Sequence, residues 1–181
     1  MILSLYKIIT EKNILMDNLG KQRVGKLLME LVWWILTGIV AWMVAKPLWS
    51  EFVKYEYIYE LILFVVILIT YTRYLFLLKY TFLAQFQVGK FILIFASIPL
   101  VFYLINLFFG YQDFLERQSE GMETYQLYFR ADMSFSEHGE VIKYLSKVYS
   151  FFALCAIIVV IMSPFRLLIS YWRVYNKVGT V

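Results

Sequence analysis

Four long runs of apolar residues, separated by polar stretches, dominate the chain. The runs cover residues 27–49, 58–78, 91–109 and 148–169. Each has about 20 residues, the length that an α-helix needs to cross roughly 30 Å of hydrocarbon. Strands of a membrane barrel would alternate polar and apolar residues over about ten positions, and these runs do not alternate. The pattern therefore predicts an all-α integral membrane protein whose four transmembrane helices form a single domain.

The composition supports this prediction and narrows the range of partners. Hydrophobic residues make up 62% of the chain and charged residues 17%, whereas soluble domains have about half and about a quarter, respectively. We expect the lipid bilayer, its anionic headgroups, and other membrane subunits or further copies of the chain as partners. No nucleic acid is expected.

Basic residues gather at one end of the four predicted spans. Lysine and arginine are retained on the cytoplasmic side of a membrane, so their positions predict orientation. They lie before the first span, around the connection between the second and third, and at the end of the fourth: Lys7, Lys12, Lys21, Arg23, Lys26, Arg73, Lys79, Lys90, Arg166, Arg173 and Lys177. Both termini are therefore predicted to be cytoplasmic, in an inner or plasma membrane.

The segment before the first span, residues 1–26, is cytoplasmic in this prediction. Its apolar residues fall roughly on one face of a helix: Ile2, Leu5, Ile9 and Met16. Such a face is typical of a helix that lies in the headgroup layer, so this segment is a candidate interfacial helix.

The longest polar stretch, residues 110–147, is acidic and too charged to cross the membrane. Its first acidic residues have the spacing i, i+3, i+7: Asp113, Glu116 and Glu120. This spacing places them on one face of a helix that continues the third span beyond the membrane. Ser134 and Glu137 have capping-box spacing for a second helix that leads into the fourth span. We predict a helical extracytoplasmic hairpin, whose acidic stripe is either an outer docking surface or part of a solvated connector.

The second and fourth spans end in a similar way at the predicted inner boundary. Arg73 and Arg166 each follow a hydroxyl residue by three positions, and further basic residues come after each. The candidate contacts to lipid or to a partner are Arg73, Lys79, Arg166, Arg173 and Lys177.

Three interpretations of the two arginines remain open. They anchor their helices in an anionic leaflet, where each basic residue contributes about 1 kcal/mol. Alternatively, they face inward and pair with a carboxylate, either Glu30 at the inner end of the first span or one from a partner. In the third interpretation, they line a vestibule for an anionic substrate or a lipid headgroup.

The single cysteine and the single histidine restrict the chemistry that the chain can perform. Cys155 has no second thiol for a redox pair or a thiolate metal cage. His138 alone cannot supply bis-histidine haem ligation or a multi-histidine metal site. The middle of each span also lacks the acidic residue or histidine that ion-coupled transporters normally carry. We therefore expect no cofactor, no metal site and no catalytic residues.

These observations favour a non-catalytic role. The leading hypothesis is a small polytopic subunit, scaffold or assembly factor of a larger membrane complex. The alternative is a homo-oligomeric ion channel or pore with an acidic outer vestibule. A third hypothesis is a lipid-handling enzyme that uses Arg73 and Arg166 to bind phosphate. The four spans contain no motif that identifies a family.

Overall fold

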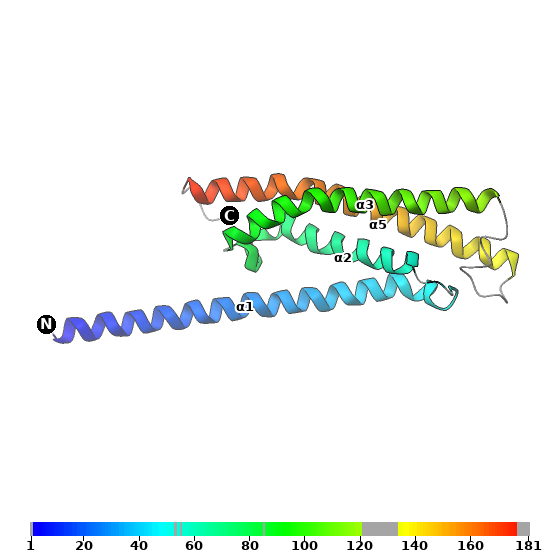
Figure 1. The fold of residues 1–181 in the computed structure, drawn as a ribbon. Helices are drawn as coiled ribbons and strands as arrows, with labels where there is room; N and C mark the ends of the chain where they lie inside the picture. The colour runs from blue at the N-terminus through cyan, green and yellow to red at the C-terminus, as the bar shows by residue number, and fades with distance from the viewer. Residues whose placement is uncertain (1, 53, 55, 85, 121–133, 177–181) are drawn as a thin grey trace.

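The computed structural model describes residues 2–52, 54, 56–84, 86–120 and 134–176. These residues form four long α-helices and two short 3-10 helices (Figure 1). The elements in chain order are α1 (Ile2–Trp49), α2 (Glu56–Phe76), η1 (Leu78–Tyr80), η2 (Phe82–Ala84), α3 (Gln87–Glu120) and α5 (Phe135–Tyr175).

Each of the four α-helices contains a stretch that is long and apolar enough to cross a membrane. The stretches are Val24–Trp49, Glu56–Phe76, Gln87–Glu116 and Ser136–Tyr175. The all-helical fold and the four candidate spans predicted from the sequence are thereby confirmed. The start of α1 and the end of α5 lie toward the same end of the molecule (Figure 1).

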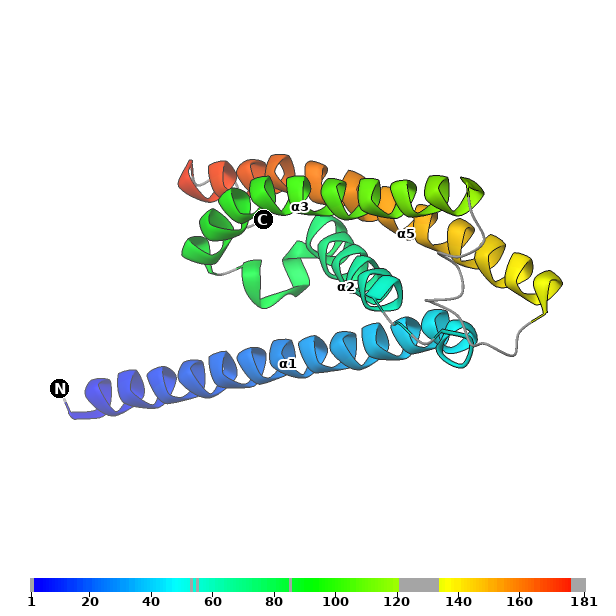
Figure 2. The same ribbon diagram turned by 45° about the vertical axis from the view of Figure 1, so that its right-hand side comes forward.

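Helices α2 and α5 form the centre of the structure, with α1 packed along α2 and α3 packed along α5 (Figure 2). The core consists of apolar side chains between these helices, among them the fully buried Leu61 and Phe64 of α2. The apolar stretches of α1 and α3 are much less buried than those of α2 and α5. Two of the four helices therefore turn most of their apolar surface away from the protein.

Helix α1 is continuous from Ile2 to Trp49. The segment before the first span thus continues the same helix in a nearly straight line (Figure 1). Its predicted place in the headgroup layer stays a prediction.

The second helix ends two residues before the end of the apolar run that predicts it. It ends at Phe76, and Leu77 leaves the helical conformation with φ −110° and ψ 21°. The following residues form the two 3-10 helices, and the hydroxyl of Thr81 donates to the carbonyl of Leu78 at 2.8 Å. Lys79 therefore lies on a 3-10 turn and not on a continuation of α2.

Helices α3 and α5 meet along a regular seam with a seven-residue repeat. At one end the Nζ of Lys90 lies 3.1 Å from the Oγ of Ser170. The next contact, between the hydroxyl oxygens of Ser97 and Ser163, measures 3.3 Å. Two further steps of seven residues lead to stacked rings with centroids 3.9 Å apart: those of Tyr111 and Tyr149. This repeat is the spacing of antiparallel helices packed as in a left-handed coiled coil.

The helices on both sides of the acidic segment extend as predicted. Helix α3 continues to Glu120. Ser134 caps α5 in a complete capping box, since its side chain accepts from the backbone of Glu137 while the Glu137 carboxylate accepts from the backbone N–H of Ser134. The connection between the two arms of the predicted hairpin falls on residues 121–133, which lie outside the described residues, so the hairpin stays a prediction.

Candidate functional site: the basic cluster at the ends of α2 and α5

Arg73, in the last turn of α2, is buried and paired with a carboxylate from another helix. Its side chain is 4% exposed, and its Nη2 lies 2.5 Å from the Oε2 of Glu30 on α1. The guanidinium also donates to the hydroxyl of Tyr74 at 3.1 Å and lies over that ring. Since a charge in the apolar part of a bilayer is costly, this pairing lowers the cost of placing Arg73 here. Of the three interpretations of Arg73, pairing with Glu30 is the one that the structure shows.

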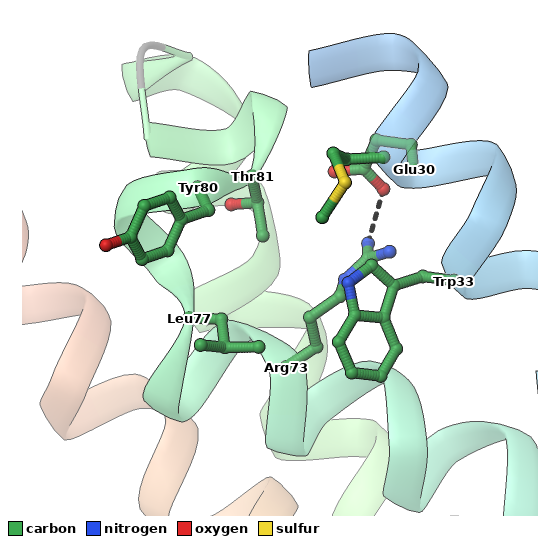
Figure 3. Close-up of a pocket in the computed structure, with 7 residues that line it drawn as sticks. Glu30, Trp33, Arg73, Leu77, Tyr80 and Thr81 are labelled. Atoms are coloured by element: carbon green, nitrogen blue, oxygen red, sulfur yellow. Dashed lines mark ion pairs between the residues drawn. The ribbon is translucent and has the colours of Figure 1, made fainter. Parts of the chain in front are cut away.

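A cavity of about 280 Å³ adjoins this ion pair, between α1 and the chain that follows α2 (Figure 3). Its wall is almost entirely apolar apart from the ion pair. On the α1 side it is lined by Met29, Glu30 and Trp33. On the other side it is lined by Arg73, Leu77, Tyr80 and Thr81.

Arg166 on α5 also contacts a neighbouring helix. Its Nε donates to the backbone carbonyl of Leu75 at 3.2 Å. The last carbonyls of a helix have no partner within the helix, and the C-terminal end of the helix dipole attracts a cation. Arg166 therefore caps the end of α2 and links α5 to it.

The third basic residue of the cluster, Lys90, was counted only toward orientation in the sequence analysis. It lies in the first turn of α3, is fully buried, and donates to Ser170. The sequence does contain a signal for it. Lys90 and Ser97 are seven residues apart, as are Ser163 and Ser170, and polar residues repeating at this interval on two helices indicate a shared seam.

The remaining residues of the predicted basic group lie at the surface or outside the described chain. Lys79 and Arg173 are exposed, whereas Lys177 lies outside the described residues. The structure thus brings Arg73, Arg166 and Lys90 into contacts between helices and leaves Lys79 and Arg173 on the surface. A role of these residues in contacting lipid or a partner stays a prediction.

The acidic stripe is exposed where it can be described. Asp113 and Glu116 point outward from α3, while Tyr111 and Phe114 on the same stretch are buried. Glu120 is the last residue of α3, and its side chain lies outside the described part. The predicted helical continuation is confirmed, and a docking role for the stripe stays a prediction.

A further polar contact between helices lies nearer the opposite end of the bundle. The hydroxyl of Tyr149 on α5 donates to the carboxylate of Glu60 on α2, at 2.5 Å. The same hydroxyl lies 3.4 Å from the carbonyl oxygen of Leu107 on α3. Tyr149 therefore joins three helices through one oxygen atom, a connection that the sequence did not predict.

The polar groups described above form hydrogen bonds and an ion pair with groups on neighbouring helices. The Glu30 carboxylate neutralises Arg73, Arg166 binds a helix end, and Lys90 and Tyr149 bind hydroxyl or carboxylate groups of adjacent helices. Such contacts hold helices in register within a membrane.

The fold and its polar contacts define an all-helical chain with four helices long and apolar enough to span a membrane. Comparison with protein-family models, with curated proteins and with solved structures finds no match.

Proposed function

We propose that the chain is a non-catalytic polytopic membrane protein that acts as a subunit, scaffold or assembly factor of a larger membrane complex. The observation that supports this proposal most strongly is the exposed side chain of Asn106. This residue lies within the apolar part of α3, yet its side chain is exposed and makes no hydrogen bond among the described residues. Around it the surface of α3 is apolar, with Phe102, Tyr103 and Phe109 all exposed.

An exposed amide on an apolar helix face favours a protein partner over lipid. Lipid tails offer no hydrogen bond to an amide, whereas a second helix can supply one, at a gain of about 1 to 2 kcal/mol. The aromatic side chains beside Asn106 add contact area that a partner helix can cover. The polar groups inside the bundle support the same non-catalytic proposal, because they bind groups on neighbouring helices.

The alternative, a homo-oligomeric pore, has less support. A pore needs a continuous polar lining. The polar seam between α3 and α5 is closed, because Ser97, Ser163 and Ser170 are all buried and bonded across it or to their own helices. Asn106 lies on the opposite face of α3 from Ser97, so the two do not line one channel.

The test is affinity purification of the full chain from native membranes in a mild detergent, followed by quantitative mass spectrometry. We expect one or a few other membrane proteins in a constant ratio to the chain. Asn106→Leu should lower their recovery several-fold. Ile158→Leu, at an exposed position of α5, is the matched control and should recover them fully.

Recovery of the chain alone as a monomer contradicts the proposal. A symmetric assembly of this chain only, with ion flux after reconstitution into liposomes, would establish the pore instead.

A further inference from the structure

A second cavity, of about 240 Å³, lies against the first one, between α1 and η1. It is lined by Gly25, Lys26 and Met29 of α1 and by Lys79 and Tyr80 of η1. Met29 and Tyr80 line both cavities. The two spaces are therefore neighbours in one groove between α1 and the segment after α2.

The charges along this groove are unequally distributed. At its inner end Arg73 is neutralised by Glu30. At its outer part lie Lys26 and Lys79, and neither makes an ion pair with any residue that the structure describes. Lys79 is exposed and Lys26 is half-buried. The groove therefore has a neutral, apolar end and a cationic end.

The two ends of the groove lie at different heights along α1. Along α1, Lys26 is seven residues before Trp33, a rise of about 10 Å. Trp33 lies nearer than Lys26 to the middle of the candidate span Val24–Trp49. A crossing by α1 would therefore place Lys26 nearer the headgroups and the cavity beside Trp33 nearer the acyl chains. Tyr80, between the two parts, is of the residue type enriched at this interface.

The dimensions also suit a long amphiphile better than a compact ligand. Small-molecule sites usually enclose roughly 300 Å³ or more and bury most of their ligand. Each of the two spaces falls below that volume, but they follow one another along α1. A molecule that fills both must carry an anionic group at one end and an apolar chain at the other.

We propose that this groove binds one anionic glycerophospholipid, with its phosphate between Lys26 and Lys79 and an acyl chain passing Met29 into the cavity beside Trp33 and Leu77. The occupant is chosen by charge complementarity at the lysines and by the apolar wall beyond them. This site is independent of the partner surface at Asn106, so either proposal can fail while the other holds.

The test uses the purified full chain in mild detergent, titrated with phosphatidylglycerol or with phosphatidylcholine of the same acyl chains, and native mass spectrometry to count bound lipids. We expect one phosphatidylglycerol to bind in preference to phosphatidylcholine. Each lysine near an anionic headgroup is worth about a five-fold change in affinity. Lys26→Gln with Lys79→Gln should therefore reduce the affinity for phosphatidylglycerol about thirty-fold and leave phosphatidylcholine binding unchanged.

The matched control is Lys143→Gln with Lys147→Gln. It removes the same charge from exposed positions near the start of α5, and it should keep the preference. Competition with glycerol 1-phosphate, which has the anionic group but no chain, should not displace the lipid at an equal concentration. Equal binding of the two lipids, an unchanged preference in the groove variant, or displacement by glycerol 1-phosphate would each overturn the proposal.

Discussion

The Nζ of Lys90 donates a hydrogen bond of 3.1 Å to the Oγ of Ser170, and both side chains are fully buried between α3 and α5. The pair lies at the first step of the seven-residue seam that these helices share. A buried lysine near the N-terminus of a helix is unfavourable both for its lost hydration and for the helix dipole. Ser170 compensates for part of that cost.

The first prediction follows from this dependence of Lys90 on its partner. Ser170→Ala leaves the ammonium without its hydrogen bond and should lower the free energy of unfolding by about 1 to 3 kcal/mol. Lys90→Met replaces the buried charge with an apolar side chain of similar length and should stay within about 1 kcal/mol of the wild type. Titration with sodium dodecyl sulfate in mixed micelles measures both. A larger loss for Lys90→Met than for Ser170→Ala would contradict this account.

The seam also shows how far the sequence could predict this fold. The four spans could be found from apolar length alone, because a bilayer requires about 20 apolar residues per helix whatever the sequence. The packing partners of each helix could not be found in this way. Every face of a membrane helix is apolar, so periodicity does not distinguish buried from lipid-facing positions. The polar repeat at Lys90, Ser97, Ser163 and Ser170 is the exception, because the same seven-residue interval on two helices indicates that they share a seam.

The candidate site was predicted in part for a related reason. Arg73 and Arg166 could be identified because charges stand out in an apolar run. The partners of the two arginines differ in whether they can be recognised in the sequence. Glu30 is itself charged and was among the alternatives, whereas the carbonyl of Leu75 is a backbone group exposed only because α2 ends at Phe76. No glycine or proline occurs between Phe76 and Phe86 to mark that end.

The second prediction concerns the ion pair between α1 and α2. Arg73→Leu leaves the Glu30 carboxylate without its cation, and Glu30→Leu leaves the guanidinium without its anion. Each should cost about 3 kcal/mol or more of the free energy of unfolding, because a mostly buried charge is left unpaired. The double variant should recover much of the loss, giving a coupling energy of at least about 1 kcal/mol in a double-mutant cycle. Additive losses would show that the two side chains act independently.

The third prediction concerns the hydroxyl of Tyr149. Tyr149→Phe keeps the ring stacked on Tyr111 and removes the hydrogen bond to Glu60. A hydrogen bond to a charged group contributes about 1.5 to 3 kcal/mol, so unfolding should become easier by about that amount. Tyr171→Phe is the control, because Tyr171 is an exposed tyrosine of the same helix, and it should change stability by less than about 0.5 kcal/mol. Equal stabilities of the two variants would mean that the contact with Glu60 contributes nothing.

The fourth prediction tests the orientation inferred from the basic residues. Cys155 is the single cysteine of the chain, so Cys155→Ser gives a background in which one new thiol reports its own side of the membrane. In intact cells, a membrane-impermeant maleimide should label Ser50→Cys and Glu140→Cys, both at exposed positions on the acidic side. It should label Asn176→Cys, at the end of α5, only after the membrane is permeabilised, because basic residues keep that end in the cytoplasm. The reverse pattern would mean that the orientation is inverted, and labelling of Ser50→Cys and Glu140→Cys from opposite sides would contradict the four-span arrangement itself.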